Sequence, residues 1–294
     1  MIERKDITEE IKSFRNRMNA NDKPLSVLDK DCVRDYAILS AYRDMQLRTI
    51  KGHEMSYTDE LRETLAQEFV KYFQFPSPAT PEDFDKIHKG LCEGFLNGLN
   101  EVFARYKLAK QEFGKAQKVI NMTFKYLYCF DDAEKFEDYF SFCHMPLDSY
   151  TLNWCYYDNN QKLYNKSEIK NWSSLDEDVY YILSKKIGEK LAFPLKEEFK
   201  IWPKEIAKSK ETEFIKSIID FIAGNYDEYN SKNKFRRVDK ERIKTIVENK
   251  VAAVNRDRRK DNDADKGIDK EKAKAMIDAI IKSQLFDEIK NSLN

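Results

Sequence analysis

Hydrophobic residues recur at steps of three or four along most of the chain, the spacing that places them on one face of an α-helix. The clearest case lies between residues 113 and 127, where Phe113, Ala116, Ile120, Phe124 and Leu127 follow this step. We therefore expect a helix over these residues with its apolar face buried.

A second row on the same predicted helix is polar. Gly114, Lys118, Asn121 and Lys125 follow the same step on a different face, so two amines and an amide share one row. Most charged rows of this kind are solvated surfaces. A solvent-exposed basic face is thus the simplest interpretation, and a functional one requires a partner for Lys118.

Similar spacing predicts three helices before this one, over residues 6–19, from about Asp29 to Gly52, and from Thr58 to the proline-rich residues 75–81. A long helix should follow, because Thr80 is a suitable N-cap and Pro81 fits the first helical position. Its predicted buried stripe consists of Ile87, Leu91, Phe95, Leu99, Val102 and Tyr106.

Three glycines lie inside this long helix, at Gly90, Gly94 and Gly98. Glycine in a helix interior costs roughly 0.5–1 kcal/mol relative to alanine. We therefore expect a second helix to approach this side of the backbone closely.

The pattern is less regular after residue 130. Tyr150 to Tyr157 is rich in aromatic residues and is predicted as a short strand, and Ser174 to Glu177 resembles a capping box that opens a helix toward Gly188. Pro203 is predicted to open a further helix that ends at Gly224.

The composition changes near residue 230. Residues 231–260 are rich in lysine and arginine, residues 255–267 have the composition of a linker, and an amphipathic helix is expected from about Asp269. We therefore predict a helical main domain over residues 1–230 and a charged C-terminal segment over residues 231–294. The basic part of that segment is either a phosphate-contacting surface or a solvated helix face.

The composition favours an all-α fold, a multi-helix bundle with little or no β-structure. Only eight glycines and seven prolines occur among 294 residues, and 35% of the chain is charged. Lysine plus arginine equals aspartate plus glutamate at 52 each, so the chain has no overall basic bias. Nucleic-acid binding would depend on where the charges lie.

The cysteine pattern and the hydropathy indicate a soluble, cytoplasmic protein without a membrane partner. No apolar run approaches 18 residues, no secretory signal is evident, and the cysteines form no CxxC pair; they are Cys32, Cys92, Cys129, Cys143 and Cys155. The last three lie near His144, but their gaps match none of the common zinc-ligand spacings. We predict neither a metal nor a cofactor.

Two short motifs together resemble a known family. Gly114-x-Ala116-x-Lys118-x-x-Asn121 lies at the start of a predicted helix, and Pro146-Leu147-Asp148-Ser149 follows it. The pair is similar to Gly-x-Gly-x-Lys-Thr-Ala-Asn and Pro-Val-Asp-Thr-His of the helix-hairpin-helix DNA glycosylase superfamily. The spacing between Lys118 and Asp148 is closest to the archaeal oxoguanine glycosylase branch. The resemblance covers about residues 105–155.

The resemblance implies a DNA glycosylase and lyase that acts on a base flipped out of duplex DNA. It makes Lys118 the nucleophile, Asp148 its catalytic partner, and Gly114 and Ala116 the hairpin positions that hold a DNA phosphate. Ala116 replaces the second hairpin glycine. The other candidates for contacts with the DNA or the flipped base are Gln117, Asn121, Lys125, His144, Trp154 and Trp172.

Other interpretations give these residues no catalytic role. Asp148 after Pro146 also suits a turn or a helix cap, and His144 a buried core histidine. Arg48 and His53 match the loose spacing of helical HEPN ribonucleases, although Gly52 would interrupt their helix. A non-catalytic helical protein that binds a protein or a nucleic acid is the third hypothesis.

Overall fold

The structure is a computed structural model that describes residues 3–45, 58–157, 163–164, 168–169, 171–207 and 209. The chain divides into two compact units, Met1–Ile206 and Ala207–Asn294. Nearly all described residues belong to the first unit. The predicted boundary near residue 230, the basic segment and the C-terminal amphipathic helix lie outside the described residues.

Every regular element among the described residues is helical, which confirms the predicted all-α class. In chain order the elements are η1 (Arg4–Ile7), α1 (Thr8–Arg17), α2 (Lys30–Cys32), the π-helical η2 (Val33–Ile38), α3 (Leu39–Asp44), α4 (Asp59–Gln74), α5 (Pro81–Arg105), α6 (Phe113–Leu127), η5 (Ala133–Phe136), α7 (Glu137–Phe140), α8 (Ser149–Tyr157), η6 (Trp172–Ser174) and α9 (Glu177–Lys190). A further helix covers residues 194–207.

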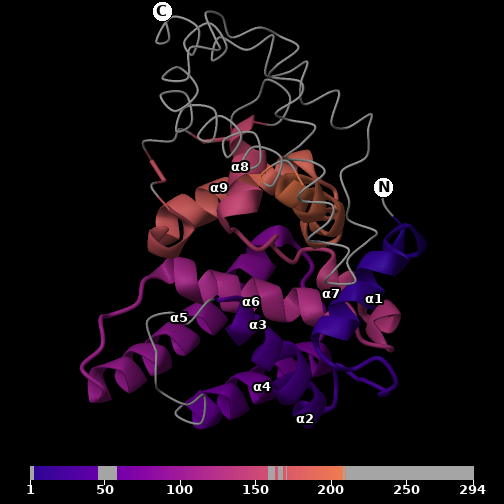
Figure 1. Ribbon diagram of the computed structural model, residues 1–294, viewed down its shortest axis with the longest axis horizontal. Helices are drawn as coiled ribbons and strands as arrows, with labels where there is room; N and C mark the ends of the chain where they lie inside the picture. The colour runs from indigo at the N-terminus through magenta and orange to yellow at the C-terminus, as the bar shows by residue number, and fades with distance from the viewer. Residues whose placement is uncertain are drawn as a thin grey trace, which may run out of the picture. The chain divides into compact units, whose positions relative to one another are not determined.

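Helix α6 is the centre of the first unit (Figure 1). It packs against α5, α3 and η2 on one side and against η6 and α9 on another. Of its 15 residues only Lys115 is not buried. The simplest interpretation of the polar row was therefore wrong: Lys118 and Lys125 lie inside the molecule, because α6 is covered on all sides and has no solvated face.

The predicted starts of α4 and α5 are confirmed. Helix α4 begins at Asp59, directly after Thr58, and ends before the proline-rich stretch. Helix α5 begins at Pro81, and the Asp83 amide donates a hydrogen bond to the Thr80 side chain at 3.2 Å. This bond satisfies one of the amides that a helix N-terminus leaves free.

The buried stripe of α5 differs from the prediction at both ends of the helix. Phe84, His88 and Cys92 are fully buried, whereas Ile87 remains 37% exposed; Phe95 and Leu99 are buried as predicted. Toward the C-terminal end Phe103 is buried, whereas Val102 and Tyr106 are only partly buried. Both rows follow helical spacing, so periodicity alone could not separate them. The Phe84 ring packs against aromatic rings of the neighbouring helices α4 and α6, so the row of residues that contains Phe84 is the one that becomes buried.

The glycine prediction is correct at one position only. A Cβ at Gly98 would lie 2.6 Å from Leu61 Cδ1, so helix α4 does approach there. At Gly90 and Gly94 none of the described atoms lies within 4 Å of an added Cβ. Both glycines instead line an open groove between α4 and α5.

Three predictions after residue 140 were wrong. The residues from Ser149 to Tyr157 form helix α8 rather than a strand, because Asp148 caps its first amides. Helix α9 is capped by Asp176 and not by Ser174. Pro203 lies within the helix of residues 194–207, which begins at Pro194.

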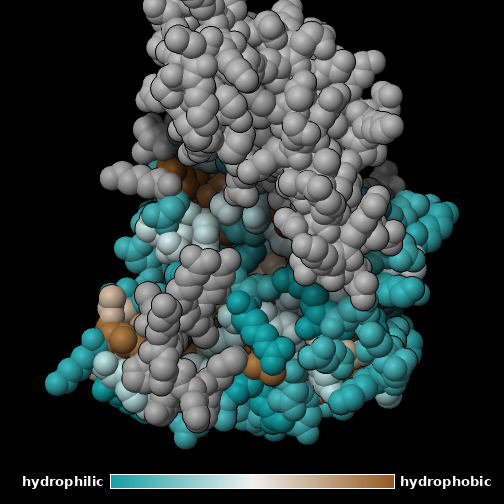
Figure 2. Space-filling view, in the orientation of Figure 1, coloured by the Kyte–Doolittle hydropathy of each residue, from teal (hydrophilic) through white to brown (hydrophobic). Residues whose placement is uncertain are grey.

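The described surface is mostly hydrophilic on the face that Figure 2 shows, with a few apolar patches. Within the described ranges, no helix is both long enough and apolar enough to cross a membrane. All five cysteines are free thiols, four of them buried. No three His, Cys, Asp or Glu side chains in the described part of the chain are grouped so that they could hold a metal ion.

Candidate active site around Lys118 and Asp148

The structure brings Lys118 and Asp148 together across 30 residues of sequence. The Lys118 Nζ atom donates a hydrogen bond to Asp148 Oδ2 at 2.7 Å. Lys118 projects from the middle of α6, and Asp148 is the residue before α8. Lys118 is 5% exposed and Asp148 is 8% exposed, so the pair is shielded from bulk water but not sealed off.

The two oxygens of Asp148 have separate partners. Oδ1 accepts hydrogen bonds from the backbone amides of Tyr150 at 2.9 Å and Thr151 at 3.0 Å, which is the geometry of a helix N-cap. Oδ2 accepts from Lys118 and, at 3.3 Å, from the Trp202 indole N–H. Asp148 therefore caps α8 with one oxygen and presents the other to the lysine.

These contacts determine the charge state of Asp148. Burial alone would raise the pKa of the Asp148 carboxyl, but the Lys118 ammonium and the amides of Thr151 and Tyr150 outweigh burial and lower it. The carboxyl is therefore ionised at neutral pH and pairs with Lys118 as a carboxylate.

The pair lies at a pocket of about 200 Å³. The residues that line this pocket are Phe14, Arg17, Arg43, Asp44, Lys118, Met122, Lys125, Asp148, Ser149, Tyr150, Trp172 and Trp202. Four of these side chains are basic and two are acidic. Lys118 is paired with Asp148, Arg17 with Asp44 at 2.7 Å, and Lys125 with Glu198. The positive excess at the pocket therefore comes from the exposed Arg43.

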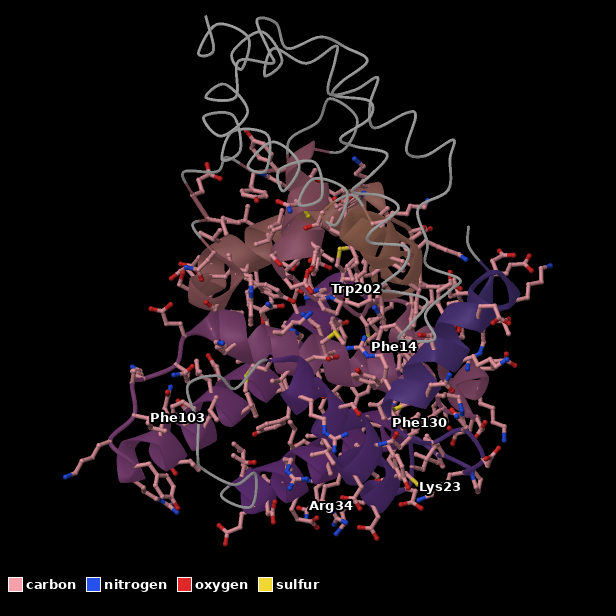
Figure 3. All side chains as sticks on the ribbon, in the orientation of Figure 1. Phe14, Lys23, Arg34, Phe103, Phe130 and Trp202 are labelled. Carbon is pink, nitrogen blue, oxygen red and sulfur yellow. The ribbon has the colours of Figure 1, made fainter. Side chains whose placement is uncertain are left out.

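Aromatic rings form part of the wall. Phe14 on α1 and Trp202 on the helix of residues 194–207 lie side by side, with ring centroids 6.3 Å apart (Figure 3). The Arg17 guanidinium lies 5.5 Å from the centre of the Trp202 ring. Trp172 is held by Lys115, whose amine lies 4.8 Å from its ring centre. The pocket thus combines flat apolar faces with cations.

A second buried ion pair adjoins the first. Lys125, two turns after Lys118 on α6, is paired with Glu198 of the helix of residues 194–207. Lys125 is 1% exposed and Glu198 is fully buried. Burial lowers the pKa of the Lys125 amine and raises the pKa of the Glu198 carboxyl. Glu198 Oε1 has no hydrogen-bond partner among the described residues.

Three predicted site residues lie in a polar network behind the pocket and not in its wall. Gln117 and Asn121 are fully buried and hydrogen-bonded to each other at 3.2 Å. His144 contacts the Tyr180 hydroxyl at 2.9 Å and Asp85 at 2.9 Å. Their polar atoms are committed to protein partners, which gives them a role in holding the site together.

The other predicted residues divide between the wall and the core. Lys125 and Trp172 line the pocket. Ala116 is fully buried. Trp154 is not among the pocket-lining residues, and its ring lies 5.3 Å from the Lys190 amine. The HEPN-like pair Arg48 and His53 lies outside the described residues.

Gly114 has a packing role in this structure. Its amide donates to the Leu175 carbonyl at 3.1 Å, and a Cβ at this position would lie 2.0 Å from the Trp172 carbonyl oxygen. Only glycine allows the 172–175 segment to approach α6 this closely. The contact carries Trp172 to the pocket, so Gly114 contributes to the site without binding a phosphate through that amide.

Gly114→Ala is therefore expected to destabilise the protein by about 3 kcal/mol or more, since a backbone atom cannot yield easily. Gly94→Ala is the matched control. It lies in the interior of α5 with open space around it, so alanine should stabilise the helix by roughly 0.5–1 kcal/mol. Urea denaturation followed by circular dichroism measures both. A Gly114→Ala variant as stable as the wild type would contradict the packing argument.

Several pocket residues were missed from sequence. They are Phe14, Arg17, Arg43, Asp44, Tyr150 and Trp202, and they come from elements distant in the chain. One signal was present: Glu198 and Trp202 are four residues apart, so a helix that starts at Pro194 places both on one face. Because the helix was predicted to start at Pro203, this spacing of Glu198 and Trp202 was not recognised.

No similarity to a known protein assigns a function to this site. Comparisons of the chain with protein-family models, with curated proteins and with solved structures find no match.

Proposed function

We propose that this protein is a DNA glycosylase with lyase activity in which Lys118 is the nucleophile and Asp148 assists it. The observation that carries the proposal is the hydrogen bond of 2.7 Å between Lys118 Nζ and Asp148 Oδ2 at a pocket. Nucleophilic attack on a sugar carbon requires an amine and a carboxylate that lie together beside a cavity.

A purely structural role explains the pair less well. Asp148 already caps α8 through Oδ1, so the cap does not require Lys118. Burying an ion pair costs desolvation that the attraction between the charges often fails to offset. Titratable pairs in such surroundings gather at functional sites, which favours a chemical role for this one.

The proposed reaction uses each atom of the pair. As the base departs with the electrons of the glycosidic bond, positive charge develops on the sugar and the Asp148 carboxylate stabilises it. The Lys118 nitrogen forms a bond to C1′ while one of its protons passes to Asp148 Oδ2. The resulting amine adduct opens to an imine, from which strand cleavage by β-elimination follows.

The pocket suits a small part of a nucleotide. Its volume of about 200 Å³ is below the roughly 300–1,000 Å³ typical of pockets for drug-sized ligands. A single base or sugar is of the appropriate size, provided that it is rotated out of the duplex. Stacking on an aromatic face such as Trp202 or Trp172 contributes about 1–3 kcal/mol per base.

The positive excess at the pocket supports a nucleic-acid substrate. Arginine and lysine supply most of the sequence-independent affinity for phosphates. Arg43 is exposed at the pocket, and Arg17 is oriented by Asp44 and by the Trp202 ring. In this proposal the two arginines contact the DNA backbone on either side of the flipped nucleotide.

The proposal is tested with duplexes that carry an abasic site, 8-oxoguanine or uracil. The wild-type protein is expected to cleave the abasic strand, because that substrate needs no base recognition, and to cleave at one of the modified bases. Products are resolved on a denaturing gel. Salt-dependent binding without cleavage of any duplex would refute the enzyme and favour the non-catalytic binding protein.

A further inference from the structure

The segment before Asp148 is buried but irregular. Residues 143–147 have no regular secondary structure, yet Cys143, Met145 and Leu147 are at most 1% exposed. Buried backbone of this kind must find hydrogen-bond partners outside a helix or a sheet. Side chains of neighbouring helices supply them here.

Gln117 is the partner of Leu147. Its Nε2 donates to the Leu147 carbonyl at 2.7 Å, and its Oε1 accepts from the Leu147 amide at 3.1 Å. The side-chain amide thus pairs with both polar groups of one residue. Thr151 holds the other side, donating to the Pro146 carbonyl and accepting from the Asp148 amide, both at 2.8 Å.

The two contacts of α6 with this segment are adjacent. Gln117 bonds Leu147, and the next residue, Lys118, bonds Asp148. The first contact therefore determines how far the backbone of Asp148 lies from α6, and with it the distance between the amine and the carboxylate.

The orientation of Gln117 is fixed from behind. Asn121 Nδ2 donates to Gln117 Oε1 at 3.2 Å and to the Tyr180 hydroxyl at 2.8 Å, and Asn121 Oδ1 lies 3.0 Å from His88 Nε2. Burial first, and then His144, holds the pKa of His88 well below its usual range, so the ring is neutral. A neutral His88 with its proton on Nε2 donates a hydrogen bond to Asn121. The Tyr181 hydroxyl, 2.9 Å from Nδ1, donates a hydrogen bond to this second ring nitrogen.

We propose that Gln117 is a positioning residue that holds Asp148 at bonding distance from Lys118. The inference rests on the proposed function, because it concerns the reacting pair of that reaction. Gln117 touches neither the pocket nor the substrate in this account; it acts through Leu147 and Asp148. Loss of its two hydrogen bonds to Leu147 would let the 143–148 segment move away from α6.

Gln117→Leu removes both hydrogen bonds to Leu147 at similar volume, together with the bonds to the Gly114 carbonyl and to Asn121. We expect the single-turnover rate of strand cleavage at an abasic site to fall about 10²-fold, since a displacement near 1 Å has effects of that size. The dissociation constant for the duplex should stay within threefold of the wild-type value. Gln111→Leu is the matched control, because Gln111 bonds a backbone carbonyl at the protein surface and its variant should retain the wild-type rate.

Gln117→Glu gives a signature that a structural role would not produce. An ionised carboxylate can accept from the Leu147 amide but cannot donate to its carbonyl, whereas the protonated acid does both. The rate of this variant relative to the wild type is therefore expected to rise as the pH falls. A ratio that stays constant with pH, measured where both proteins are folded, would overturn the proposal.

A second readout needs no DNA and separates this inference from the proposed function. Reductive methylation with formaldehyde and cyanoborohydride, followed by mass spectrometry, gives the labelling rate of Lys118 with Lys115 as the internal reference. We expect Lys118 to be labelled at least threefold faster in Gln117→Leu than in the wild type, because its carboxylate partner is released.

The outcomes are distinct. An inactive wild type whose Lys118 labelling still responds to Gln117→Leu would refute the glycosylase and retain the positioning role. An active wild type with an equally active Gln117→Leu variant would retain the glycosylase and refute the positioning role. Failure of both Gln117 variants to fold at any pH would assign Gln117 to fold stability and overturn the positioning role.

Discussion

Lys118→Gln is expected to lower the rate of strand cleavage at an abasic site by at least about 10³-fold, because no other group replaces a missing nucleophile. The protein should stay folded. The Trp202 N–H and two backbone amides remain bound to the Asp148 carboxylate, and glutamine adds no new charge. Single-turnover cleavage, quantified on denaturing gels, measures the effect.

Lys115→Gln is the matched control for this experiment. Lys115 lies three residues earlier on α6 and is half-buried over the Trp172 ring, but it has no contact with Asp148 among the described interactions. The same chemical change there should alter the rate by less than tenfold. Equal losses in the two variants would show that the lysines act through general affinity for DNA.

Lys125→Met is expected to destabilise the protein by about 3–5 kcal/mol near neutral pH, the cost of leaving one member of a buried ion pair without its partner. The stranded group is Glu198, which is fully buried. Urea denaturation gives the free energy of unfolding. Replacing both residues by methionine should recover most of the loss, since an apolar pair of similar volume removes the buried charge altogether.

The pH dependence of Lys125→Met gives a second check. Burial raises the pKa of Glu198, so the folded variant binds a proton more tightly than the unfolded chain does. Stability then falls as the pH rises from the unfolded value toward the folded one. The loss should therefore be smaller at pH 5 than at pH 8. A loss that is independent of pH would contradict a stranded carboxyl.

The sequence predicted best those elements whose signals are local. Thr80 and Pro81 begin α5 as expected, because an N-cap and a proline at the first position act within one turn. The central helix α6 was also predicted within a few residues. Its burial on all sides was not, since the polar row resembles a solvated face until its partners are known.

The errors arose where tertiary contacts decide between two locally reasonable outcomes. The residues from Ser149 to Tyr157 have the composition of a strand, but Asp148 caps them into a helix while it bonds Lys118 from a distant part of the chain. The Gly114 amide bonds Leu175, 61 residues later, a contact that the motif around Gly114 does not predict. The spacing of residues along the sequence does not predict contacts between such distant parts of the chain.

The sequence named the two residues at the centre of the candidate site, and of the residues around them only Lys125 and Trp172. The resemblance named Lys118 and Asp148, which the structure brings to 2.7 Å. Phe14, Arg17 and Trp202 were not named, because each comes from a helix whose packing against α6 depends on the whole fold. A short motif can point to two residues, whereas a pocket depends on the arrangement of all the helices that surround it.

The central claim is that the Lys118 amine forms a covalent bond with the sugar of its substrate. Borohydride added during reaction with an abasic-site duplex reduces the imine and fixes the protein to the DNA. We predict an adduct that mass spectrometry of the digested protein locates at Lys118 and that is absent in Lys118→Gln. An adduct located at another lysine, or none on any duplex, would contradict the account.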